Sequence, residues 1–380
     1  MGFYGFYLVT KSPKNLLFHK NIRALTTILW IHFFVILFSI ILSLDSISEF
    51  KHIARKLHFL IGPFIAVVIY SQKIDLKIFI FSVKVSLVAC FIVVLIIFLT
   101  WNQDSSPFIF GISKIGGMFN TNILGDMIVS MTFMSLVRIY DENQEEAMLT
   151  VISLLSGASV LFMTGSRASW LVFVVLTLFT LFVAFRKIKS FFSKRKFIFI
   201  FGLLTFLILF SALSPYFVKK INQTYDSSAI WFQDHSKHSS SGIRLDMWLS
   251  SLKALEDMPW HGYGYRSANK EVSKYSEYFS KEISIYTHLH NEYITNTMSA
   301  GLVGLVSVLS LTLAPLFLFF KNRKSDKAKP YILMGIYLCV SYFVFSFFHI
   351  GFGEENINAF YIFFISYLLP SVLREADSNI

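Results

Sequence analysis

Long apolar stretches recur along most of the chain and are separated by short polar segments. A helix that crosses a bilayer needs about 20 mostly apolar residues. By this measure the sequence predicts ten membrane spans: Leu25–Leu44, Ile53–Tyr70, Ile78–Leu99, Thr121–Tyr140, Ala147–Met163, Ser169–Phe185, Phe197–Leu213, Ile294–Phe320, Tyr331–Phe348 and Ala359–Leu373. We therefore expect an all-α polytopic membrane protein with about ten, and up to twelve, transmembrane helices.

Composition agrees with this pattern. Hydrophobic residues make up 55% of the chain and charged residues only 15%, against about 25% charged in soluble domains. A soluble fold could not bury so much apolar surface, whereas lipid solvates the outer face of a membrane protein. The net charge of +11 could indicate nucleic acid, but basic residues also mark cytoplasmic loops. We therefore expect membrane lipids and no nucleic acid as partners.

The distribution of lysine and arginine predicts the orientation. With the N-terminus inside, the cytoplasmic segments hold 19 basic residues and the short outer loops hold five: Lys51, Arg55, Lys56, Lys114 and Arg167. This bias follows the positive-inside rule. Both termini are expected in the cytoplasm of a bacterial cell, with the protein in its inner membrane.

One connection is much longer than the others. It runs over residues 214–293 and divides the chain into N-terminal spans (1–213), a periplasmic loop and C-terminal spans (294–380). Leucine and tryptophan recur at helical spacing between Leu245 and Leu255, and Pro259 ends that pattern. His261-Gly-Tyr-Gly-Tyr265 is typical of a tight turn. Short helices are therefore predicted within the loop.

Arg167 lies between two apolar runs in Thr164-Gly-Ser-Arg-Ala-Ser169, with no acid nearby in sequence. An arginine at that depth is costly and is a functional candidate. Alternatively, it reaches out to lipid phosphates. Gly165, Ser166 and Ala168 are small enough to let a ligand or a helix approach closely, which favours function.

Arg244 lies near the start of the predicted loop helix, in Ser241-Gly-Ile-Arg-Leu-Asp246. The free N–H groups of a helix N-terminus suit phosphate, and an arginine adds a bidentate donor. Taken alone, a solvated arginine paired with Asp246 explains the pattern better.

His290 lies where the long loop returns to the membrane, in His288-Leu-His-Asn-Glu-Tyr293. A histidine at such a junction can act as a general base near neutral pH, and Asn291 and Glu292 could orient it or a bound sugar. A histidine without a role at the water interface is the alternative. The His-x-His pair, with His235 and His238, is a weak metal signal because no carboxylate or cysteine pattern completes it, so no metal or cofactor is expected.

Two arginines and a histidine on one side of the membrane suit glycosyl transfer from a lipid pyrophosphate. Positive charge stabilises the departing pyrophosphate, and a base takes the proton of the attacking hydroxyl. Aromatic residues of the loop could stack on sugar rings or anchor the loop at the interface: Trp231, Trp248, Trp260, Tyr263 and Tyr265.

Over residues 120–350 the chain resembles the O-antigen ligase and O-antigen polymerase superfamily. The resemblance depends on the order and spacing of the Thr164–Arg167 motif, Ser241–Trp248, Pro259–Gly264, His290–Tyr293, Gly301 and Gly304. It implies a GT-C-like helical fold and a metal-independent, inverting transfer. It also implies Arg167 and Arg244 as pyrophosphate binders and His290 as the base.

The resemblance favours an O-antigen ligase, which joins an undecaprenyl-pyrophosphate-linked glycan donor to a lipid A-core acceptor on the periplasmic face. Asn291 and Glu292 are further expected substrate contacts. An O-antigen polymerase, with the same donor and a second lipid-linked glycan as acceptor, is the nearest alternative. A transporter is a third; its signature would be paired charges inside spans, and Lys84 has no evident partner in the sequence.

Overall fold

The computed structural model describes residues 20–43, 50–72, 74–100, 120–139, 141–194 and 239–377, with short pieces between 218 and 234. All regular elements in these ranges are helices, as predicted. By internal contacts the chain divides into two units. Residues 1–72, 221–335 and 346–380 form the first unit, and residues 73–220 and 336–345 form the second.

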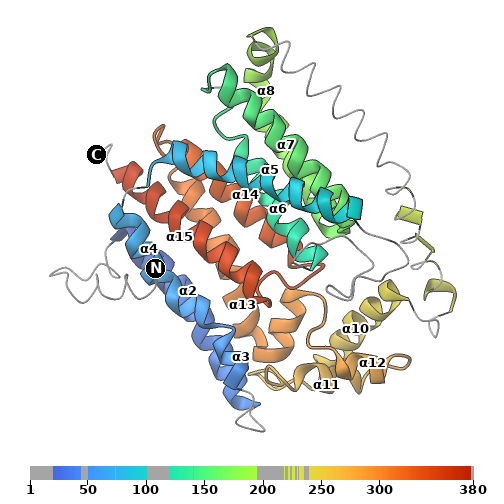
Figure 1. The fold of residues 1–380 in the computed structure, drawn as a ribbon. Helices are drawn as coiled ribbons and strands as arrows, with labels where there is room; N and C mark the ends of the chain where they lie inside the picture. The colour runs from blue at the N-terminus through green and yellow to red at the C-terminus, as the bar shows by residue number, and fades with distance from the viewer. Residues whose placement is uncertain are drawn as a thin grey trace. The chain divides into compact units, whose positions relative to one another are not determined.

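The first unit combines long apolar helices with the described part of the long loop from Ser239 onward (Figure 1). Its long helices pack against one another: α2 (Lys20–Leu42), α4 (Leu57–Gln72), α13 (Glu292–Lys321) and α15 (Glu355–Asp377). The short α3 (Phe50–Ala54) precedes α4. The loop contributes α10 (Ser240–Ala254), α11 (Ala268–Ser273) and α12 (Ser280–Ile285), so the predicted short helices are present.

The loop helices share a hydrophobic core of their own. Met247, Val272, Phe279 and Leu289 are fully buried in it, together with Met298 from α13. Burial of this apolar surface stabilises the loop and fixes it to the start of α13. Residues of the loop are therefore held at defined positions against the helices.

The second unit consists of α5 (Leu76–Thr100), α6 (Thr121–Ser135), α7 (Gln144–Thr164), α8 (Arg167–Lys194) and the last part of α14 (Lys329–Phe345). Helices α5, α6 and α7 pack on one another, and α8 contacts α6 and α7. Tyr337 of α14 lies among Phe133, Phe173 and Phe179, and its hydroxyl is 2.9 Å from that of Thr180.

Nine of the ten predicted spans coincide with helices, within five residues at each end except that α8 continues nine residues past Phe185; the seventh, 197–213, lies outside the described residues. Within the described ranges, six helices are long and apolar enough to cross a membrane, and residues 167–183 of α8 and 329–345 of α14 are shorter apolar helices. The chain therefore has the character of a polytopic membrane protein. The number of ten to twelve spans stays a prediction.

Helix α13 is broken, which the sequence pattern did not predict. Ala300 and Gly301 leave the helical conformation, with φ of 65° at Gly301. The predicted tight turn docks at this break: Tyr263 N–H donates to the carbonyl of Met298 at 2.7 Å, and Gly264 N–H donates to that of Ser299 at 3.0 Å. Carbonyl groups that the break frees from the helix thus find partners in the loop.

Gly301→Ala is expected to lower stability by more than about 2 kcal/mol, because alanine is strained at this positive φ and a Cβ would collide with the carbonyl of Trp260. The midpoint of thermal unfolding in detergent would measure this effect. Val303→Ala, at a 52% exposed position two residues on, is the matched control and should shift the midpoint little. An equal shift in both variants would contradict the account of the break.

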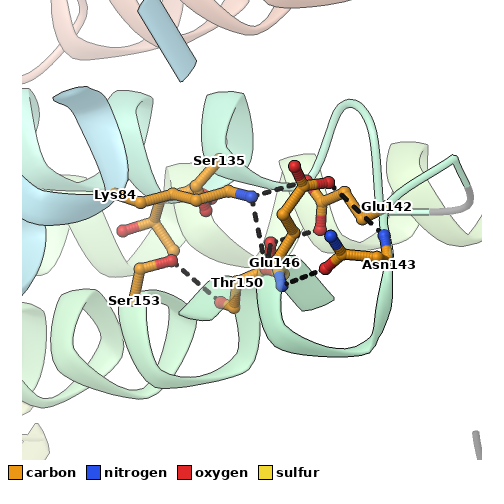
Figure 2. Close-up of polar contacts among 8 residues, drawn as sticks. Lys84, Ser135, Glu142, Asn143, Glu146, Thr150 and Ser153 are labelled. Atoms are coloured by element: carbon orange, nitrogen blue, oxygen red, sulfur yellow. Dashed lines mark hydrogen bonds and ion pairs between the residues drawn. The ribbon is translucent and has the colours of Figure 1, made fainter. Parts of the chain in front are cut away.

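Lys84 has a buried partner, contrary to our sequence interpretation. Its Nζ lies 2.5 Å from Oε1 of Glu142, and the side chains of both are about 5% exposed (Figure 2). Thr150 donates to the other carboxylate oxygen at 2.6 Å. Asn143 and Glu146 form a capping box at the start of α7, directly after Glu142. The pair links α5 to the turn between α6 and α7. The two residues are 58 positions apart, so their contact could not be seen in the sequence.

Glu142→Leu should destabilise the second unit by about 3–5 kcal/mol, because Lys84 would be left charged and buried. Removing both charges with Lys84→Met and Glu142→Leu should restore most of this loss. Thermal unfolding of the single and double variants in detergent tests the expectation. A double variant that is less stable than Glu142→Leu would show that the ion pair itself is not the stabilising feature.

Candidate functional site

Arg244 lies in the second turn of α10, where local sequence fixes the helix start. Ser239 is the N-cap: its hydroxyl oxygen accepts a hydrogen bond from Gly242 N–H at 2.9 Å. The helix ends before Pro259, as predicted. Asp246, the partner suggested by the sequence, is buried and accepts a hydrogen bond from Ser276.

His290 lies in the turn that joins α12 to α13. Its φ of 51° is the one positive value among the described residues other than glycine. The turn is held by its neighbour Leu289, whose carbonyl accepts a hydrogen bond from Trp248 of α10 at 3.0 Å. The His290 ring packs edge-on against His288 and Tyr286, with centroids 4.5 and 5.3 Å away. Its Nδ1 is buried and has no hydrogen-bond partner among the described residues.

The structure brings His290 and Arg244 into one electrostatic cluster. Burial lowers the pKa of His290, and the proximity of His288, Arg244 and His349 adds to this effect, so that the pKa is about 2. Burial, His349 and Arg244 likewise lower the pKa of His288 to about 3. Both imidazoles are therefore neutral at pH 7, and His290 is ready to accept a proton but is a weak base while the positive charges around it are unbalanced.

Asn291 and Glu292 are tied to the protein itself. Asn291 caps α13 by accepting from Ile294 N–H, and its amide donates to the carbonyl of Phe347 at 3.0 Å. The Glu292 carboxylate accepts from Asn296 at 2.7 Å and from Phe352 N–H at 3.0 Å. These bonds fasten the turn of His290 to the segment before α15. Contact of either residue with substrate stays a prediction.

Arg167 begins α8 in the second unit. Gly165 ends α7 in the left-handed conformation, with φ of 64°, which explains the glycine of the motif. Ser169 donates to Oδ1 of the fully buried Asp126 at 2.8 Å and lies 2.7 Å from the hydroxyl of Ser166. An acid from α6 thus anchors the turn that carries Arg167. The convergence of Arg167 with Arg244 and His290 stays a prediction.

The aromatic residues of the loop have different roles. Trp231 belongs to the loop core, Trp248 packs against it, and Tyr263 bonds to the carbonyl of Ala254 at 2.7 Å. Trp260 is 76% exposed. Tyr265 lines a cavity of about 190 Å³ in the first unit, which makes it and Trp260 the better candidates for contact with sugar.

Basic residues of this cavity were not singled out in the sequence. Arg55, Lys56 and Arg266 line it together with His288. A signal was present, because Arg55 and Lys56 are among the five basic residues that the orientation placed in short outer loops. Within the described ranges, no group of three or more potential ligands could hold a metal ion. His235 and His238 lie outside them.

Apolar helices of spanning length, with a half-buried cluster of arginine and histidines close to the start of α13, indicate a helical membrane protein with a polar site. Residues 151–309, which include Arg167, Arg244 and His290, match the O-antigen ligase family model. The match confirms the predicted resemblance to the O-antigen ligase and polymerase superfamily and supports the function of a glycosyltransferase-like enzyme.

The chain is also similar to a protein of Haemophilus influenzae that is described as uncharacterized. The two sequences are 24% identical over 365 residues, which cover 92% of this chain and 86% of that protein. The similarity therefore extends over the spans before residue 151 as well.

Proposed function

We propose that the protein is an O-antigen ligase. In this proposal it lies in the bacterial inner membrane with both termini in the cytoplasm, has a GT-C-like arrangement of spans, and transfers an undecaprenyl-pyrophosphate-linked glycan to lipid A-core on the periplasmic face. The observation that carries it is the cluster of Arg244 with a neutral, half-buried His290 inside the segment that matches the family model.

The reaction requires one bond to form and one to break. Nδ1 or Nε2 of His290 accepts the proton of the acceptor hydroxyl as its oxygen attacks the anomeric carbon of the donor sugar. The bond between that carbon and the pyrophosphate oxygen breaks, and the electron pair leaves with the pyrophosphate. Attack from the face opposite the leaving group inverts the anomeric carbon. Arg244 and Arg167 stabilise the growing negative charge, so no metal ion is needed in this scheme.

Donor binding would also activate the base. The charge of Arg244 is one cause of the low pKa of His290, and a bound pyrophosphate would neutralise it. The pKa of His290 would then rise, and the imidazole would become a stronger base once the donor is in place. Because of this coupling, His290 would accept the proton of the acceptor hydroxyl only after the donor pyrophosphate is bound.

Deletion of the gene, followed by electrophoresis of lipopolysaccharide, tests the proposed function. Loss of all glycan-capped core, restored by the wild-type gene but not by a His290→Ala gene, is expected for a ligase. A polymerase mutant should retain core bearing one repeat, and a normal ladder would reject both. Turnover of a lipid-linked donor by purified protein in detergent would separate an enzyme from a transporter.

A further inference from the structure

The cavity of about 190 Å³ in the first unit lies one side chain away from the proposed base. His288 and Tyr286 line it, and both rings pack against that of His290. Its other walls come from the segment around α3, the turn and helix after Gly264, the start of α13 and the segment before α15. The space is large enough for several water molecules, and therefore for a phosphate or carboxylate group.

Lys56 is the most informative residue of this cavity. It is 4% exposed, and its Nζ donates to the carbonyl of Phe352 at 2.9 Å and lies 5.6 Å from the centroid of the Tyr265 ring. Among the described residues it forms no ion pair and no second hydrogen bond, although an ammonium group has three donors. A buried ammonium with unused donors is costly, and a buried ionisable residue at the end of a span is a functional candidate.

Glu292 is close enough for its charge to attract Lys56, but no direct ion pair joins the two among the described residues. Both carboxylate oxygens of Glu292 are bonded to Asn296 and Phe352, and Glu354 is exposed. Arg55 pairs at 3.3 Å with Glu355, where both side chains are half exposed and the pair is weak.

Further donors lie around the same space. Arg266 Nη1 is 3.0 Å from Nε2 of His52, which places its guanidinium at the cavity wall. The hydroxyl of Ser299 is 1% exposed and has no hydrogen-bond partner among the described residues. The Lys56 ammonium is a point charge, the Arg266 guanidinium is a planar fork, and Ser299 supplies a hydroxyl. Together these three groups suit an oxyanion.

We propose that this cavity binds an acidic group, a phosphate or a carboxylate, carried by the acceptor glycan. The inference rests on the proposed function, in which Arg167 and Arg244 hold the donor pyrophosphate and His290 takes the proton of the acceptor hydroxyl. In that arrangement, the molecule that lies next to His290 on the side of His288 is the acceptor. An anion held by Lys56 and Arg266 would fix the sugar whose hydroxyl reaches His290, and would select acceptors that carry the charge.

Calorimetric binding to the full-length protein in detergent tests the cavity without requiring turnover. The probes are a core oligosaccharide that carries phosphate, the same oligosaccharide after phosphatase treatment, and inorganic pyrophosphate. Wild-type protein should bind the phosphorylated probe at least about tenfold more tightly than the treated one. Arg266→Gln and Lys56→Met should remove this difference and leave pyrophosphate binding unchanged. Lys253→Met, at an exposed lysine of α10, is the control.

Equal binding of both oligosaccharides by the wild type would overturn the proposal. Loss of pyrophosphate binding in the Arg266→Gln and Lys56→Met variants would also overturn it, because the cavity would then bind the donor. Arg266 is exposed, so Arg266→Gln should fold even if the buried Lys56→Met does not. Phosphate-dependent binding without glycan transfer would instead refute the proposed ligase function and leave the anion site standing. With an active enzyme, the same two variants should raise KM for the phosphorylated acceptor about tenfold and leave KM for the donor unchanged.

Discussion

Replacing His290 with alanine is expected to lower the rate of glycan transfer about 100- to 10,000-fold while donor binding persists. This is the range that a positioned general base contributes, and Arg244 would still be present to bind pyrophosphate. The measurement is single-turnover transfer from a lipid-linked donor by purified protein, together with donor binding. Full activity of the variant would refute the assignment of His290 as the base.

Two further variants separate chemistry from structure. His290 has a φ of 51°, and asparagine tolerates the left-handed region better than most residues. His290→Asn should therefore keep the turn while removing the base, and should be as inactive as His290→Ala. His288→Ala keeps the base and removes its neighbour, so a milder effect is expected. Equal loss in the His288 and His290 variants would indicate a structural role for the pair.

The pH dependence of transfer distinguishes His290 in the free protein from His290 in the complex with the donor. In the free protein the pKa of His290 is lowered to about 2, from a usual value near 6.5. Its imidazole is therefore unprotonated throughout pH 5–7, and kcat/KM for the donor should not fall through its titration in that range. Donor binding would raise this pKa, so the acid limb of kcat should lie at higher pH than that of kcat/KM. Coincident limbs would contradict activation by the donor.

Features that depend on nearby residues were predicted well from the sequence. The apolar runs gave nine helices at nearly their observed positions, and Ser239 and Pro259 bracket α10. The glycines of the tight turn at 262 and 264 have positive φ, as that turn requires. Each of these follows from spacing or from one residue's backbone preference.

Features that depend on distant partners were missed. Apolar spacing continues through residues 294–320, so the break at Gly301 is visible only when the loop turn supplies donors to the freed carbonyls. Glu142 and Asp126 lie far in sequence from Lys84 and Ser169, which they contact. Lys56 and Arg266 are 210 positions apart, so their shared cavity could be suspected only from the outer position of Lys56.

If Arg167 and Arg244 hold the same pyrophosphate, as we propose, the effects of substituting them should be strongly coupled. Arg167→Ala and Arg244→Ala should each lower transfer about 100- to 1,000-fold, the usual cost of removing one group that stabilises transition-state charge. Arg→Lys at either position should also impair transfer, because an ammonium cannot form the bidentate fork. The quantity to measure is kcat/KM for the lipid-linked donor.

The double variant gives the decisive comparison. If both guanidinium groups hold the same pyrophosphate, loss of one already misplaces the leaving group, and the second substitution costs much less than it does alone. The effects of residues with no shared partner instead multiply. Lys253→Ala, combined with each arginine variant, supplies that independent reference, because Lys253 is exposed and pairs with Glu277. Multiplicative loss in the Arg167 and Arg244 double variant would mean that the arginines act on different groups, and Arg167 would then have to be removed from the proposed site.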